Sequence, residues 1–174
     1  MSGVSEAGAE LSVDRRYRYS LWRRCFPGSP LVVIGLNPST ADETEDDQTI
    51  RRCKSYAGQL GAKGGLIVVN LYAYRERDPD GVWFLERWTE RAAVEHPDEV
   101  GRNDRAILAA AVGAHLVIAA WGDFSWARQR ARDVAALLER HGVKLHALGV
   151  TATGAPRHPS RAPNGLVPQP WEPS

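Results

Sequence analysis

The sequence predicts a single α/β domain in three layers, with helices on both faces of a mainly parallel, four-stranded sheet. Four short apolar runs, each of a length typical of a buried strand, alternate along the chain with segments of helical periodicity. The predicted strands cover residues 31–36, 66–72, 115–121 and 143–148. Such alternation is typical of parallel strands joined by crossover helices. Right-handed crossovers taken in chain order predict the strand order 2-1-3-4.

Three helices are expected in this αβα domain. They cover residues 48–60, 97–112 and 125–141. In the first helix, apolar side chains recur every three or four positions, and Gly61 is the expected stop. In the last helix, Ser125 is the expected N-cap and Gly142 the expected stop.

The chain outside this core is expected to be less regular. Residues 1–13 are small and polar, and we predict a disordered lead-in there, followed by one domain over residues 14–174. Residues 17–22 alternate polar and apolar side chains, which fits an edge strand or a short arm. The polar and aromatic segment 75–97 predicts an irregular or helical excursion. The tail from Gly149, rich in Pro, Gly and Arg, predicts a loop.

Composition favours one globular, cytoplasmic protein. A chain of 174 residues with 43% hydrophobic content can bury a substantial core. The 22 basic and 21 acidic residues give a net charge of +1, which argues against tight non-specific binding of nucleic acid. No apolar run reaches the length of a membrane helix, and the first residues lack an apolar signal core. We expect a monomer that does not bind membranes.

The cysteines and acidic residues do not predict a cofactor. Cys25 and Cys53 form no CxxC pair, and an iron–sulfur cluster usually takes four cysteine ligands. A disulfide is not expected in a reducing compartment. The acidic run over residues 42–47 lacks the regular spacing of metal ligands. We therefore expect no metal and no cofactor.

Four short motifs each lie at the end of a predicted strand or in the loop after one. They are Gly35-Leu36-Asn37-Pro38-Ser39, Val68-Val69-Asn70-Leu71, Ala120-Trp121-Gly122 and Arg157-His158-Pro159-Ser160. In an open α/β sheet, ligands bind outside the carboxyl ends of the strands. We therefore expect Asn37, Asn70 and His158 to line one cleft.

In their order and wording, these motifs resemble those of the uracil-DNA glycosylase superfamily. Its members carry a Gly-x-Asn-Pro or Gly-x-Asp-Pro motif and a His-Pro-Ser loop near the C-terminus. Taken whole, roughly from Tyr17 to Trp171, the chain most resembles an uncharacterised bacterial family, domain of unknown function 1643. The resemblance implies a uracil-DNA-glycosylase-like fold and an N-glycosidase that hydrolyses the base–sugar bond. Its substrate would be nucleic acid or a free nucleoside or nucleotide. A non-catalytic module that binds nucleotides or nucleic acid in the same cleft is the alternative.

The resemblance also implies a role for each central residue. Asn37 would hold the attacking water, Asn70 would read the base edge, and His158 would stabilise the leaving base. A fixed donor aimed at the oxygen that gains charge is an effective stabiliser of such a leaving group. From the residues alone, Asn37 equally fits a strand–turn–helix junction, and Asn70 fits an amide bonded to neighbouring backbone.

Further residues of the motifs are expected to contact the ligand: Gly35, Pro38, Ser39, Tyr72, Trp121, Arg157, Ser160 and Arg161. The aromatic rings could stack on a base, and the arginines could hold a phosphate. The alternatives are ordinary packing and solvated surface charge. An apolar wedge that would push a base out of a duplex is not evident, although Leu166 is a candidate. We therefore expect a nucleobase-containing ligand, with any binding of DNA or RNA weak and directed to single strands.

Overall fold

The fold is built on one sheet of seven strands. A computed structural model of the chain describes residues 6–24, 26–39, 41–75, 97–163 and 165–173. The strands are β1 (Glu6–Leu11), β2 (Arg18–Arg24), β3 (Leu31–Gly35), β4 (Leu66–Asn70), β5 (Leu116–Ala119), β6 (Leu145–Ala147) and β7 (Gln169–Pro170). The helices are α1 (Gln48–Gln59), α3 (Pro97–Ala111) and α4 (Arg128–Glu139), with 3₁₀ turns η2 (Ser125–Ala127) and η3 (Pro159–Arg161).

The expected four-stranded, mainly parallel sheet is wrong. The sheet is mixed, with the order β1-β2-β4-β3-β5-β6-β7. The pairs β4–β3, β3–β5 and β5–β6 are parallel, whereas β1–β2, β2–β4 and β6–β7 are antiparallel. The antiparallel additions come from the two ends of the chain. The end strands β1 and β7 are small, polar or proline-containing, so their pairing depends on backbone hydrogen bonds that hydrophobic patterning does not reveal. The alternation in β2 predicts a strand but not the direction in which it runs.

The N-terminal hairpin corrects two expectations. Residues 6–11, which we expected to be part of a disordered lead-in, form β1 and pair with β2. The expected edge strand or arm over residues 17–22 is the interior strand β2, because it has β1 on one side and β4 on the other. Its alternate residues Tyr19 and Leu21 are fully buried, as an interior position requires.

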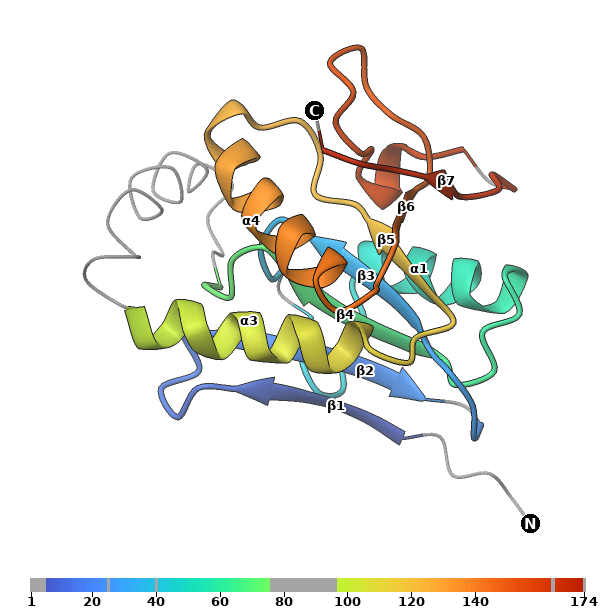
Figure 1. The fold of residues 1–174 in the computed structure, drawn as a ribbon. Helices are drawn as coiled ribbons and strands as arrows, with labels where there is room; N and C mark the ends of the chain where they lie inside the picture. The colour runs from blue at the N-terminus through green and yellow to red at the C-terminus, as the bar shows by residue number, and fades with distance from the viewer. Residues whose placement is uncertain (1–5, 25, 40, 76–96, 164, 174) are drawn as a thin grey trace.

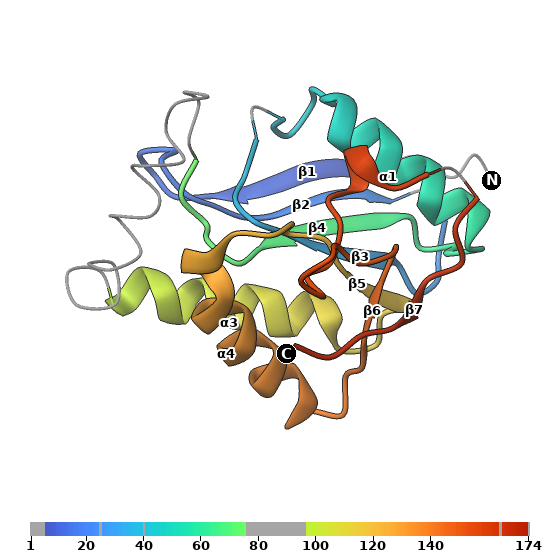
Figure 2. The same ribbon diagram turned by 90° about the horizontal axis from the view of Figure 1, so that it is seen from above.

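Helices cover both faces of the sheet (Figure 1). Seen from above, α1 lies on one face, and α3 and α4 lie together on the other (Figure 2). Two apolar clusters fill the spaces between these layers. Val33, Ile50 and Cys53 belong to the cluster under α1, and Ile34, Ile107 and Leu138 belong to the cluster under α3 and α4. The continuous apolar strands are buried on both sides, which explains why their sequences show no alternation.

The helix ends differ from expectation at one point. Helix α1 is capped by Asp47, whose Oδ1 accepts a hydrogen bond from the Ile50 N–H at 2.8 Å. It is followed by Gly61 in the left-handed region at φ 70°. The expected Ser125 cap is wrong, because Ser125 is the first residue of η2 and Phe124 precedes it without a side-chain cap. The predicted excursion over residues 75–97 lies mostly outside the described residues, as does Cys25.

The acidic run over residues 42–47 is engaged in structural contacts. The Asp46 carboxylate pairs with Arg23 and with Lys54, each at 2.8 Å. Glu43 pairs with Arg15 at 2.7 Å. These contacts and the Asp47 cap give the run a role in holding α1 against β2. Among the described residues, no helix has the length and apolar character needed to cross a membrane.

Candidate functional site

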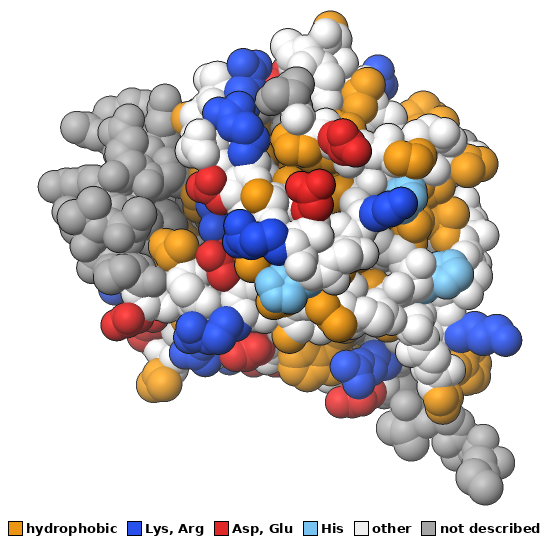
Figure 3. Space-filling model, viewed as in Figure 1, with side chains coloured by type: hydrophobic (Ala, Val, Ile, Leu, Met, Phe, Trp, Pro, Cys, Tyr) orange, Lys and Arg blue, Asp and Glu red, His pale blue; other side chains and the backbone are white. Residues whose placement is uncertain are grey.

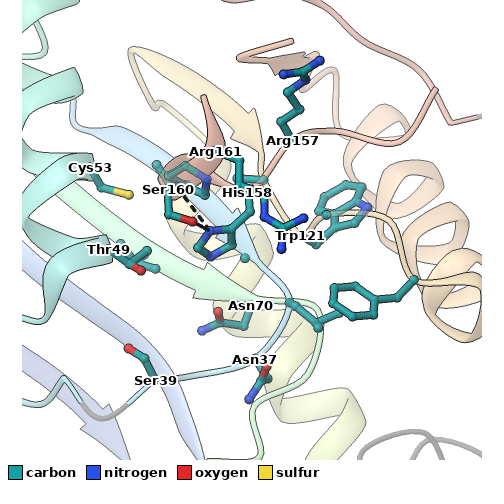
Figure 4. A pocket seen from close by; sticks show the side chains of 18 of the residues that line it. Asn37, Ser39, Thr49, Cys53, Asn70, Trp121, Arg157, His158, Ser160 and Arg161 are labelled. Carbon is teal, nitrogen blue, oxygen red and sulfur yellow. Dashed lines mark hydrogen bonds between the residues drawn. The ribbon is translucent and has the colours of Figure 1, made fainter. Parts of the chain in front are cut away.

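A cleft opens at the carboxyl ends of the central parallel strands. Strand β3 has β4 on one side and β5 on the other, so the crossovers leave it in opposite directions. Loops therefore diverge at this point and leave room between them. The cleft has a volume of about 770 Å³. Its lining includes Gly35, Asn37, Ser39, Asn70, Trp121, Arg157, His158, Ser160 and Arg161 (Figure 4).

Two residues expected at the site do not line this cleft. Pro38 is buried in the segment after β3 and is not among the residues that line the cleft. Tyr72 is buried in the core on the α3 side, where its ring lies 5.7 Å from that of Trp126. The wedge candidate Leu166 is only partly exposed, and it packs against the cluster under α1. Sequence position after a strand was not enough to predict the direction in which these side chains point.

Asn70 presents an unpaired amide to the cleft. The residue is 2% exposed, and its Nδ2 has no hydrogen-bond partner in the part of the chain that the structure describes. Its backbone carbonyl is satisfied, because Asn103 Nδ2 donates to it at 3.0 Å. Buried amides are almost always hydrogen-bonded, so a free donor inside a cleft points to an acceptor supplied from outside the chain. The alternative of an amide bonded to neighbouring backbone does not account for Nδ2.

Gly35 makes space for the Asn70 amide. The two residues are partners in the parallel pairing of β3 and β4. A Cβ atom on residue 35 would lie 2.7 Å from Asn70 Oδ1. The close approach of the Asn70 side chain is therefore the reason for glycine at this position. The backbone φ of Gly35 lies outside the left-handed region, so φ alone does not require glycine. The first motif thus shapes the cleft floor as well as supplying Asn37.

His158 is held in one orientation by the 3₁₀ turn that it caps. Its Nδ1 accepts a hydrogen bond from the Ser160 N–H at 3.3 Å and lies 2.8 Å from the Ser160 hydroxyl. A nitrogen that accepts from a backbone N–H carries no proton, so the neutral ring bears its proton on Nε2. Burial lowers the pKa of His158 below 6.5, and the nearby charge of Arg161 lowers it further, while Asp47 opposes them. The result is a neutral histidine with an N–H donor.

Asn37 follows β3 and is half-buried at the cleft. Its Nδ2 donates to the neighbouring Pro38 carbonyl at 3.3 Å. Because Nδ2 makes this bond, the acceptor Oδ1 of the amide is not used by it. An amide oxygen in such a position can accept from a water molecule and hold it in a fixed place.

Trp121 and Arg157 offer less to a ligand than their motifs suggest. Trp121 is 4% exposed and meets Trp171 edge-to-face at 5.2 Å, so little of its ring is available for stacking. The Arg157 Nε donates to the Val150 carbonyl at 2.9 Å, and its guanidinium points away from Asn70 (Figure 4). Both residues mainly stabilise the C-terminal loop around the cleft.

The structure adds lining residues that the sequence analysis missed, among them Arg18, Cys53 and Asp123. Asp123 contributes the one carboxylate among the described residues of the cleft. It accepts hydrogen bonds from the hydroxyls of Thr153 and Thr151 and interacts with Arg128, and these contacts lower its pKa despite some desolvation. Burial raises the pKa of the Cys53 thiol to about 12, which rules it out as a thiolate nucleophile. Asp123 directly follows the Trp121-Gly122 pair, so extending that motif by one residue would have found it.

Basic and acidic side chains are interspersed on the face shown in Figure 3. No broad area of one sign covers this face, in keeping with the net charge of +1. A duplex-binding surface typically gathers lysines and arginines on one face. The charge that a ligand meets here is set locally, by the residues inside the cleft.

Comparison with known proteins places the chain in a family of unknown function. No curated protein and no solved structure matches it. The family described as "Protein of unknown function (DUF1643)" matches residues 18–160. That range contains β2 through His158, and with it every strand and motif that builds the cleft. The chain belongs to the DUF1643 family.

Proposed function

We propose that the protein is an N-glycosidase that hydrolyses the bond between a nucleobase and its sugar. The observation that carries the proposal is the fixing of His158 as a neutral donor in the same cleft as the unpaired Asn70 amide. A base that leaves a sugar takes the bonding electron pair and develops negative charge on its ring oxygens. A donor that is already oriented toward that charge lowers the barrier without reorganising. The motif resemblance to the uracil-DNA glycosylase superfamily supports the same reaction.

Each residue has a separate task in this mechanism. The Asn70 amide binds the edge of the base, and its donor pairs with a ring carbonyl or nitrogen. As the C–N bond breaks, the His158 Nε2–H donates to the oxygen that gains charge. Asn37 Oδ1 accepts a hydrogen bond from the water whose oxygen adds to the sugar C1′. The proton released by that water finally neutralises the departed base or passes to solvent.

Asp123 supplies the negative charge that would stabilise the sugar in this reaction. Cleavage of a glycosidic bond leaves a sugar with oxocarbenium character, and a nearby carboxylate stabilises such a cation. The lowered pKa of Asp123 keeps this group ionised at neutral pH. A cation of this reactivity needs little help from a general base, so an amide that only orients water is sufficient.

Release of free base tests the proposal. Purified protein is incubated with deoxynucleosides, deoxynucleoside monophosphates and deaminated oligonucleotides, and free base is measured by chromatography. His158→Ala should lower the rate of release by about 100-fold or more. The matched change His141→Ala should leave it unaltered, because His141 lies exposed just after α4, where its ring contacts the Leu137 carbonyl. Equal release from wild type and His158→Ala would contradict the mechanism.

A binding module is the second candidate, and one observation favours it. The unpaired Asn70 donor in the cleft is a binding element in the ground state. Saturable nucleotide binding without release of base from any substrate would favour this candidate over the enzyme.

A further inference from the structure

Arg18 is a fully buried charge that lines the cleft. It is 1% exposed. Its Nη1 donates to the Ala41 carbonyl at 2.6 Å, and its Nε finds no partner within the described ranges of the chain. Among the described residues it takes part in no ion pair. A guanidinium has five N–H donors and remains charged, so most of its hydrogen-bonding capacity is unused.

A bulge in the N-terminal hairpin directs Arg18 into the cleft. Strand β2 is antiparallel to β4, so its first residue lies at the carboxyl end of the parallel strands. The register with β1 shifts between Glu10 and Leu11, which pair with Ser20 and Arg18 and leave Tyr19 as the extra residue. Tyr19 therefore turns to α3, where its hydroxyl donates to Glu99, and Arg18 turns to the opposite face. A bulge that re-aims one side chain is typical of functional sites.

The surroundings of Arg18 do not neutralise it. Burial, followed by the charge of Arg75, lowers the pKa of Arg18 to about 10. Asp47 and Asp42 act in the opposite direction, but among the ion pairs of the described residues none joins either of them to Arg18. Asp47 instead uses its carboxylate to cap α1. An unpaired buried charge is strongly unfavourable, and an anionic ligand would relieve it.

Two hydroxyls share the cleft with Arg18. Ser39 lies in the turn after β3, and Thr49 is in the first turn of the 12-residue helix α1 (Figure 4). The Asp47 carboxylate already occupies the start of α1, so the buried guanidinium and the two hydroxyls carry the chemistry of a phosphate site.

We propose that Arg18 forms an anion subsite of this cleft, which binds the phosphate of a free nucleoside monophosphate. The inference rests on the proposed function and narrows its substrate to nucleotides. A polymer would carry its phosphodiesters along the cleft rim, whereas Arg18 lies inside, where a small ligand can reach it. The volume of about 770 Å³ is in the range of small-molecule sites.

Affinity for matched ligands tests the subsite. The probes are deoxyuridine, its 5′-monophosphate, inorganic phosphate and a single-stranded uracil-containing oligonucleotide, each titrated calorimetrically into the full chain. We expect the monophosphate to bind wild type about tenfold or more tightly than the nucleoside, as a charge-assisted contact predicts. This preference should fall to about twofold or less in Arg18→Met. Arg105→Met, which removes the same charge from an exposed position on α3, should retain it.

The comparison of nucleoside with monophosphate in the wild-type protein remains decisive even where Arg18→Met does not fold. Arg18→Lys is a second variant, which keeps the positive charge but loses the forked donors of the guanidinium. Equal affinity for nucleoside and monophosphate would overturn the subsite. Tighter binding of the oligonucleotide than of the monophosphate would overturn the free-nucleotide assignment. Selective nucleotide binding without release of base would overturn the glycosidase and leave the subsite standing.

Discussion

Gly35→Ala should damage the cleft with only a moderate loss of stability. The new methyl group would lie 2.7 Å from Asn70 Oδ1, whereas ordinary contact begins at 3.4 Å. The amide must therefore retreat by about 0.7 Å or rotate, in a place where only 2% of the residue is exposed. Overpacking of this kind costs about 1–3 kcal/mol. Because Asn70 is displaced directly, ligand affinity should fall even where the fold is retained.

The matched control is Gly58→Ala in α1. A methyl group there meets nothing within 4 Å, and alanine is the better helix former. That change should stabilise the protein by about 0.5–1 kcal/mol and leave affinity unaltered. Urea unfolding measures both stabilities, and calorimetric titration with a deoxynucleoside monophosphate measures affinity. Wild-type stability together with wild-type affinity in Gly35→Ala would refute the close-approach argument.

Three further predictions follow from single residues. The rate of base release should be constant from pH 8 to about 6.5. Activity should be lost only as the pH falls through the lowered pKa of His158, because protonation of Nδ1 breaks the hydrogen bond that it accepts from the Ser160 N–H. A loss of activity that begins above pH 7 would count against this role of His158. Asp46→Ala should lower the free energy of unfolding by about 3 kcal/mol, because it leaves the buried Arg23 guanidinium without its carboxylate; a loss below about 1 kcal/mol in urea unfolding would contradict this. Cys53 should resist alkylation at pH 8 in the native protein and react in urea, as peptide mapping by mass spectrometry can show; rapid native labelling would disagree.

The central strands were predictable because their apolar side chains are buried on both faces of the sheet. Runs such as residues 31–36 and 66–72 are apolar throughout, and a run buried on both faces reads as one continuous segment. Strand β1 was not predictable in this way, because Glu6–Leu11 contains glycine, alanine and glutamate, and its pairing uses mainly the backbone. The mixed sheet was missed partly for this reason and partly because the alternation in β2 does not reveal the direction of the strand.

The candidate site also contains residues that the sequence predicted and residues that it did not. Asn37, Asn70 and His158 follow strands or occupy the loop after one, and the structure brings all three to one cleft. Their chemical roles remain predictions. Arg18 was missed because a charged residue in an alternating segment reads as solvent-facing. Its burial depends on a bulge, and a bulge changes which face a side chain occupies without leaving a clear mark in the sequence.

The most direct test of the account separates turnover from binding in two variants. His158→Ala should lower the rate of base release by about 100-fold or more and change ligand affinity little, because its donor acts on charge that develops in the transition state. Asn70→Ala should mainly weaken binding, because its amide meets the base in the ground state as well. Single-turnover base release measured beside calorimetric affinity gives both quantities. Unchanged turnover in His158→Ala, or unchanged affinity in Asn70→Ala, would contradict the central claim that these two residues act on one base in one cleft.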